Sequence, residues 1–151
     1  MKTKTIVTEI TKRELSDLFC IASEGSSYVG FLYKKSDYEG TELESEYDYK
    51  CDKCAKLLLA GKTIIFADYY AEDADEFYGE LPHKYSESRE CMKYTLTLED
   101  IKKGVIRALD SDDGYIKKCI NDWIEDDSCN LDLTEAEDIM QYIVFGEIVY
   151  G

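Results

Sequence analysis

One short motif in this chain has the spacing of a thiol site. Cys51 and Cys54 are separated by two residues, which is the spacing of a redox dithiol or of half a zinc site. A redox dithiol is favoured at a helix N-terminus after a strand, whereas this pair follows an acidic stretch and is predicted to lie within a helix. A zinc site needs two more ligands, for which His83 and Cys91 are the candidates. Because a single pair is a weak signal, ordinary helix cysteines are the favoured interpretation.

The six cysteines of the chain are expected to be reduced. The opening residues Met1–Thr5 lack the apolar stretch of a secretory signal, and no apolar run approaches the ~20 residues that span a bilayer. These features predict a soluble protein in a reducing cytoplasm, where disulfides are rare. Cys20 and Cys119 are assigned to apolar helix faces, where a free cysteine behaves as a small hydrophobic side chain.

Nothing else in the sequence identifies a reaction. His83 is the only histidine, and it would need Ser86, Ser88 or Cys91 as a nucleophile, none of which lies in a recognisable nucleophile motif. The acids at 125–127 could hold a magnesium ion, but the chain lacks a glycine-rich phosphate loop. We therefore expect neither enzymatic activity nor a cofactor, and the histidine is assigned to a surface loop.

Acidic residues are unevenly distributed along the chain. The net charge is −15, with 33 Asp and Glu against 18 Lys and Arg. The segments 37–48, 68–80 and 119–151 contain six, six and nine acids and no Lys or Arg. Such a surface repels nucleic acid and phosphorylated ligands and attracts basic proteins. Tyrosines in the first two segments also favour an interface, because tyrosine contributes contact area at low entropic cost.

These observations predict an acidic surface that binds a partner protein, with no direct contact to nucleic acid or membrane. A solvated face without a partner is the alternative for any one segment, but three such segments in one small domain favour a binding surface. The residues assigned to this surface are Asp37, Glu39, Glu42, Glu44, Glu46, Asp48, Glu72, Asp73, Asp75, Glu76, Glu80, Glu125, Asp126 and Asp127.

Apolar periodicity and end signals predict the elements that position these residues. Helices are expected at about 12–23, 46–60 and 98–109, along the apolar stripe of 116–124, and after a capping box formed by Thr134 and Glu137. Strands are expected at 28–33, 62–70 and 91–96, and loops at 36–48 and 71–90.

The resulting order of elements predicts one α+β domain over residues 1–151, with a small antiparallel sheet of about three strands packed with four to five helices. A chain of this length buries roughly two-thirds of its unfolded surface. Phe145, Ile148 and Tyr150 near the chain end are too apolar to be left in water. They are expected to pack on the core or, alternatively, on a second copy as a homodimer contact.

Three pieces of the sequence resemble a group of small proteins encoded by bacteriophages and prophages. The pieces are LSDL at 15–18 with ASEG at 22–25, YTLTLEDIKKG at 94–104, and QYIVFGEIVYG at 141–151. They cover about a fifth of the chain, and the last is the most specific. The resemblance implies a mobile-element origin and the cytoplasm of a bacterial host. It supplies no activity, and neither the cysteines nor the acids at 36–48 belong to its pattern.

Surface charge and the resemblance together lead to one hypothesis. The protein is expected to bind and inhibit a basic, nucleic-acid-binding host defence protein, such as a nuclease, in the manner of anti-restriction and anti-CRISPR inhibitors. Carboxylates would then act as a nucleic-acid mimic by occupying the places of phosphates in a Lys/Arg groove. The alternative is a ligand-binding or sequestering domain, or a small enzyme, with a pocket between sheet and helices.

Overall fold

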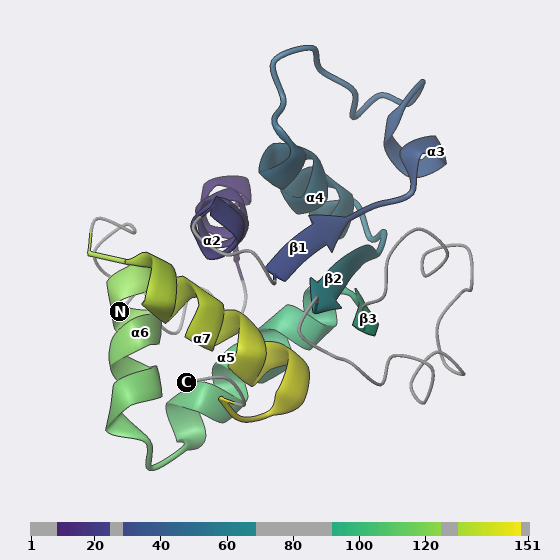
Figure 1. The fold of residues 1–151 in the computed structure, drawn as a ribbon. Helices are drawn as coiled ribbons and strands as arrows, with labels where there is room; N and C mark the ends of the chain where they lie inside the picture. Colours follow the sequence, from purple (N-terminus) through teal and green to yellow (C-terminus); the bar gives the residue numbers. More distant parts are fainter. Residues whose placement is uncertain (1–8, 25–28, 69–91, 125–129, 149–151) are drawn as a thin grey trace.

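The predicted α+β class is confirmed by a computed structural model, which describes residues 9–24, 29–68, 92–124 and 130–148 (Figure 1). Within these ranges a three-stranded antiparallel sheet packs with six helices. None of the described helices has the length and apolar character needed to cross a membrane. The helices are α2 (Lys12–Glu24), α3 (Lys35–Tyr38), α4 (Lys50–Leu59), α5 (Leu98–Asp110), α6 (Gly114–Ile124) and α7 (Leu133–Phe145), and the strands are β1 (Val29–Leu32), β2 (Ile64–Asp68) and β3 (Met92–Leu96).

β2 is the central strand of the sheet, with β1 and β3 on either side in antiparallel pairing. Residues 64–67 of this strand are all buried, so both of its faces are covered. Branched and aromatic side chains favour such a strand because they pack well on a pleated surface. Phe66 lies opposite Phe31 of β1 and Tyr94 of β3, and the three rings form a row across the sheet.

α2 connects the two helical parts of the molecule. Leu15, Leu18 and Phe19 are fully buried on one face of this helix, as their i, i+3, i+4 spacing predicts. The helix packs against α4 on one side and α7 on the other, while α5, α6 and α7 group together away from α3 (Figure 1). Trp123 of α6 is also fully buried and donates a hydrogen bond from Nε1 to the backbone oxygen of Glu14 at 2.8 Å.

α5 begins with a capping box and packs very closely on α7. The Thr97 hydroxyl accepts a hydrogen bond from the Asp100 amide at 3.2 Å, and Oδ2 of Asp100 accepts one from the Thr97 amide at 2.8 Å. Further along the helix, a Cβ atom at Gly104 would lie 2.7 Å from Cγ1 of Ile143 and 2.9 Å from its Cα. Glycine therefore allows the two helices to pack at this distance, which offsets its cost of about 1 kcal/mol within a helix.

The structure corrects two predicted boundaries. Segment 36–48, expected to be a loop, contains most of α3 and a series of turns, and α4 begins at Lys50 rather than near residue 46. α7 is capped by Asp132, whose Oδ1 accepts a hydrogen bond from the Glu135 amide at 2.8 Å, so the predicted cap Thr134 lies inside the first turn. Both Asp132 and Thr134 precede an acid by three residues, and this spacing alone does not distinguish them.

Phe145 at the end of α7 packs on the sheet. Its ring centroid lies 5.3 Å from that of Tyr94 and 6.2 Å from that of Phe66. Gly146 then adopts a φ of +79°, a left-handed conformation that lets the chain leave the helix. The predicted packing of the chain end on the core is thus confirmed for Phe145. Tyr150 lies outside the described residues, and the homodimer stays a prediction.

Candidate binding surface

The first acidic segment is organised around one buried tyrosine. Tyr38 ends α3 and is 1% exposed, so it does not belong to the predicted interface. Its hydroxyl donates a hydrogen bond to Oδ2 of Asp48 at 2.6 Å and accepts one from the Ser45 amide at 2.8 Å. The Thr41 hydroxyl donates to the Tyr38 backbone oxygen at 2.6 Å. Because these bonds connect the beginning of the segment to its end, they give the intervening chain a defined shape.

Asp48 is a buried ion-pair partner rather than a surface acid. Its side chain is 7% exposed and pairs with the ammonium group of Lys56 in α4, which also donates to the backbone oxygen of Leu43 at 3.1 Å. Burial opposes ionisation of Asp48, but hydrogen bonds from Lys56 and Tyr38 outweigh it and lower the pKa of this carboxyl. The hydrogen bond to Asp48 also raises the pKa of Lys56. Asp48 therefore stabilises the segment and is not available to a partner.

Four carboxylates of the same segment face solvent. The side chains of Glu39, Glu42, Glu44 and Glu46 are exposed, whereas Asp37 is half-buried. Glu44 accepts a hydrogen bond from the Gly40 amide at 3.2 Å, which keeps part of this chain compact. These four acids lie in residues 39–49, which we name the acidic loop, and they are the predicted partner-binding residues that the structure places at the surface.

Two tyrosines at the end of the acidic loop are exposed as well. Tyr47 is 83% exposed and Tyr49 is 77% exposed. Large aromatic side chains are enriched at protein interfaces, where they contribute contact area and a hydrogen bond. In Figure 1 the chain between α3 and α4 runs along the outer edge of the molecule, so the acids and the tyrosines are accessible together.

A polar hollow of about 490 Å³ lies beside the acidic loop. Glu39, Glu44 and Glu46 contribute to its wall, and Lys53 of α4 lies at one side. The ammonium group of Lys53 is 5.2 Å from the ring centroid of Tyr38 and 5.8 Å from that of Tyr33. A hydrogen bond with Tyr33 is the main cause that raises the pKa of Lys53, and the charges of Tyr33, Tyr38 and Glu39 add to it. The surroundings of the hollow thus favour a cation, and the protein already places one of its own there.

The remaining eight acids assigned to the binding surface belong to segments 68–80 and 119–151. Glu72, Asp73, Asp75, Glu76, Glu80, Glu125, Asp126 and Asp127 lie outside the described residues. In the described part of segment 119–151, by contrast, several acids are buried between α6 and α7. Asp122 and Glu135 have side chains that are 11% and 7% exposed, and both pair with the ammonium group of Lys118, at 2.8 and 3.2 Å.

The acids between α6 and α7 are coupled in their ionisation. Asp122 and Glu135 interact with each other through a hydrogen bond, which lowers the pKa of Asp122. Burial and the same interaction raise the pKa of Glu135, so protonation is favoured on Glu135. The Tyr115 hydroxyl donates to Oδ2 of Asp138 at 2.6 Å, and burial raises the pKa of both groups. This part of segment 119–151 is therefore an internal network, and the sequence missed it because the cation, Lys118, precedes the segment.

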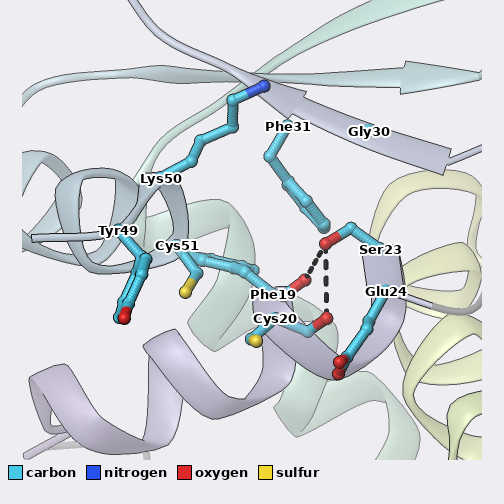
Figure 2. A pocket seen from close by; sticks show the side chains of 9 residues that line it. All are labelled: Phe19, Cys20, Ser23, Glu24, Gly30, Phe31, Tyr49, Lys50 and Cys51. Atoms are coloured by element: carbon cyan, nitrogen blue, oxygen red, sulfur yellow. Dashed lines mark hydrogen bonds between the residues drawn. The ribbon is translucent and has the colours of Figure 1, made fainter.

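A second hollow, of about 540 Å³, is bordered by α2, α4 and β1. Figure 2 shows Phe19 and Phe31 at this pocket, with the sulfur atoms of Cys20 and Cys51 lying near each other where α2 meets α4. The lining is predominantly apolar, which is the usual character of a small-molecule pocket. Cys20 is exposed, which corrects its assignment to an apolar face, because position 20 is off the stripe formed by Leu15 and Leu18.

The structure separates the two thiols of the CxxC motif. Cys54 is fully buried in the core, whereas Cys51 is half-buried and lines the apolar pocket. Burial raises the pKa of Cys54 to about 12, which makes its thiolate a rare species at neutral pH. The other two candidate zinc ligands, His83 and Cys91, lie outside the described residues. Within the described ranges, no group of three or more His, Cys, Asp or Glu side chains could hold a metal ion.

Comparisons of the chain with protein-family models, with curated proteins and with solved structures find no match.

Proposed function

We propose that the protein binds a basic surface of another protein through its acidic loop. The observation that supports this most directly is the exposure of four glutamates beside two exposed tyrosines on a loop with a defined shape. The internal bonds of Tyr38 and Asp48 mean that little conformational entropy is lost when a partner orders this surface. Glu39, Glu44 and Glu46 in the wall of the neighbouring hollow can pair with a lysine or arginine side chain of the partner in addition to the protein's own Lys53.

The class of partner follows from the charge and from the resemblance to phage-encoded proteins. A surface groove that tracks a nucleic-acid backbone is rich in Lys and Arg, and regularly placed carboxylates compete for the same groups. We therefore take the partner to be a nucleic-acid-binding defence protein of a bacterial host, inhibited by the acidic loop in the bacterial cytoplasm. The role is one of binding and needs no catalytic step.

The test compares two variants with the same change in net charge. Glu39→Gln/Glu42→Gln/Glu46→Gln neutralises three exposed acids of the acidic loop, and Glu99→Gln/Asp110→Asn/Asp112→Asn neutralises three exposed acids of α5 and the turn after it. Each immobilised protein is incubated with bacterial lysate at about 50 mM and at about 200 mM salt, a range over which screening weakens charge contacts. The partner is identified by mass spectrometry and its binding is repeated with the purified protein.

We expect the wild type and the α5 variant to retain the same basic protein at low salt, and the loop variant to lose it. Retention should fall steeply at the higher salt concentration because charge contacts dominate. Equal retention by the loop variant and the wild type would exclude the acidic loop as the binding surface. Recovery of no basic or nucleic-acid-binding protein at low salt would argue against the function itself.

The apolar pocket favours a second candidate function, which is the capture of a small ligand. Its volume of about 540 Å³ lies in the range of drug-sized ligand pockets. A thermal-shift screen with nucleotides, divalent metals and small apolar compounds tests this candidate. A ligand at 100 times its dissociation constant adds roughly 2.7 kcal/mol of stability, so a shift of several degrees with one compound would favour it.

A further inference from the structure

Two cysteines from different helices meet at the wall of the apolar pocket. Cys20 lies on α2 and Cys51 on the first turn of α4, and both line the pocket. Figure 2 shows their sulfur atoms on the same side, between the two helices. Partial desolvation and the neighbouring Cys51 raise the pKa of the Cys20 thiol to about 11, in agreement with the approach of the two sulfur atoms.

Hydrogen bonds close to the two thiols hold α2 and α4 together. The Ser16 hydroxyl of α2 donates a hydrogen bond to Oδ1 of Asp52 in α4 at 2.7 Å. Oδ2 of the same carboxylate accepts a hydrogen bond from the Tyr49 amide at 3.0 Å, which fixes the beginning of α4. Asp52 is the neighbour of Cys51 in the chain, and Ser16 lies one helical turn before Cys20. The approach of the two thiols is therefore a fixed property of the α2–α4 contact.

The other two described cysteines have a different environment. Cys54 and Cys119 are fully buried, and burial raises the pKa of each thiol to about 12. Neither is accessible to a reagent in the folded protein, whereas Cys20 is exposed and Cys51 is half-buried. Among the four described cysteines, the pair at the pocket thus combines access to solvent with a neighbouring thiol. Solvent access and a neighbouring second thiol are two of the features of a site for reversible thiol oxidation.

We propose that Cys20 and Cys51 form a reversible disulfide by exchange with a low-molecular-weight disulfide such as glutathione disulfide. The thiolate of one cysteine attacks a sulfur atom of glutathione disulfide, which forms a mixed disulfide and releases one glutathione thiolate. The thiolate of the second cysteine then attacks the protein sulfur of the mixed disulfide and releases the second glutathione thiolate. The two protons of the cysteine thiols end on the two glutathione molecules, so two cysteines are oxidised and one glutathione disulfide is reduced.

The position of the bond gives it a structural effect. It joins α2 to the first turn of α4, directly after Tyr49, where the acidic loop ends. Oxidation would also replace two thiols in the pocket wall with one disulfide bond. The same bond would reduce the conformational freedom of the unfolded chain between residues 20 and 51. The raised pKa of Cys20 makes its thiolate scarce at neutral pH, which slows the exchange, but it also leaves the reduced state without stabilisation from ionisation of Cys20.

The test uses the full chain with Cys91 and Cys129 replaced by serine, because these two cysteines lie outside the described residues. The folded protein is equilibrated with a series of glutathione to glutathione disulfide ratios, its free thiols are alkylated, and its peptides are mapped without reduction. We expect a linked peptide that contains Cys20 and Cys51 and is two hydrogen atoms lighter than the reduced pair. Cys54 and Cys119 should be alkylated only after unfolding. Dithiothreitol should restore both alkylated thiols of the pair.

Two variants provide the controls. With Cys51→Ser, we expect Cys20 to accumulate as the mixed disulfide with glutathione, since no second thiol resolves it. With Cys54→Ser, the linked peptide should still form. In the protein that keeps both thiols, oxidation should raise the midpoint of thermal unfolding by several degrees relative to the reduced form of the same protein.

Three results would overturn the proposal. The first is that Cys20 and Cys51 each carry glutathione without any linked peptide, and the second is that both remain free at the most oxidising ratio. The third is a linked peptide that joins either residue to Cys54. The principal measurement compares the reduced and oxidised states of the same Cys91→Ser/Cys129→Ser protein, so any effect of the two serine substitutions on stability is common to both states. The proposal rests on the α2–α4 contact and is independent of partner binding by the acidic loop.

Discussion

The acidic loop and the α6–α7 pair are both rich in carboxylates, but they use them in opposite ways. In the acidic loop, Glu39, Glu42, Glu44 and Glu46 face solvent, and one further acid of the loop, Asp48, has a buried side chain. Between α6 and α7 the proportions are reversed, because Asp122, Glu135 and Asp138 are all buried. The sequence shows similar runs of acids in both regions.

The difference arises from where each region finds its hydrogen-bond donors. Lys118 and Tyr115 belong to the first turns of α6 and supply donors to three acids. Beside the acidic loop, Lys56 and Tyr38 supply side-chain donors, and Asp48 is the acid of the loop that accepts from both. A buried carboxylate requires such partners, since an unpaired charge in the interior is very costly. The number of accessible donors therefore decides how many acids enter the core, and the remaining acids form the surface.

Among substitutions in and beside the acidic loop, we expect Tyr38→Ala to lower the free energy of unfolding the most. The substitution removes a fully buried ring and its bonds to Asp48 and Ser45, and it should lower the free energy of unfolding by about 3–5 kcal/mol. Tyr47→Ala and Tyr49→Ala remove exposed rings and should change it by no more than about 0.5 kcal/mol. Urea denaturation measures all three, and equal losses for the three variants would contradict the role of Tyr38 as the anchor.

A second substitution examines the donor of the α6–α7 pair. Lys118→Met removes the cation shared by Asp122 and Glu135, and we expect the midpoint of thermal unfolding to fall by several degrees at pH 7. Lys117→Met, a neighbouring exposed lysine, is the matched control and should leave the midpoint nearly unchanged. The deficit should become smaller at acidic pH, where the two carboxyls are protonated. If the two lysine variants unfold at the same temperature, the acids do not depend on Lys118.

Asp48→Asn should give a pH-dependent loss of stability. The folded-state pKa of Asp48 is lowered, so its contribution is fully present above its unfolded pKa, near 3.8, and is lost as pH falls through the folded value. At pH 7 we expect the variant to be less stable by about 1–2 kcal/mol. The two proteins should converge once the pH has fallen below the lowered folded-state pKa of Asp48. Denaturation curves between pH 2 and pH 7 test this, and a difference that is independent of pH would show that ionisation of Asp48 is not its source.

The smallest effect is expected for the exposed acids. Glu42→Gln/Glu46→Gln removes two like charges that have no ion-pair partner among the described residues, and it should raise the free energy of unfolding by no more than about 0.5 kcal/mol. The gain should disappear at high salt, because screening already weakens the repulsion. A loss of stability comparable to that of Asp48→Asn would mean that these acids belong to the folded network.

The helices and strands could be predicted because their signal is periodic. The apolar stripe of α6, which includes Ile116, Cys119 and Trp123, is fully buried as the 3.6-residue repeat requires. The anchoring role of Tyr38 could not be predicted in this way. Its hydroxyl partner, Asp48, is ten residues away in a segment without periodicity, and only the folded backbone brings the two together.

The contact between Cys20 and Cys51 has the same limitation. Each helix could be predicted separately, but the sequence does not give the rotation of α2 against α4 that brings the two thiols together. Which acids are exposed and which are buried could likewise be predicted only in part from the sequence. The run of six acids at 37–48 indicated exposed charge, and four of them, Glu39, Glu42, Glu44 and Glu46, are exposed. Segment 119–151 was likewise taken as a run of unpaired acids, because Lys118, which pairs with Asp122 and Glu135, lies one residue before it.

Gly104 helps to identify distant homologues whose overall sequence similarity to this chain is too low to detect. Surface acids and loop lengths can drift between distant relatives, but no larger residue can replace this glycine while the backbone of α7 stays where it is. The Thr97 and Asp100 capping pair stands at fixed distances before it, so the pattern Thr-x-x-Asp-x-x-x-Gly is a compact signature of this helix. A chain that retains the signature, followed by two further amphipathic helices, is a candidate homologue even if its charge is entirely different.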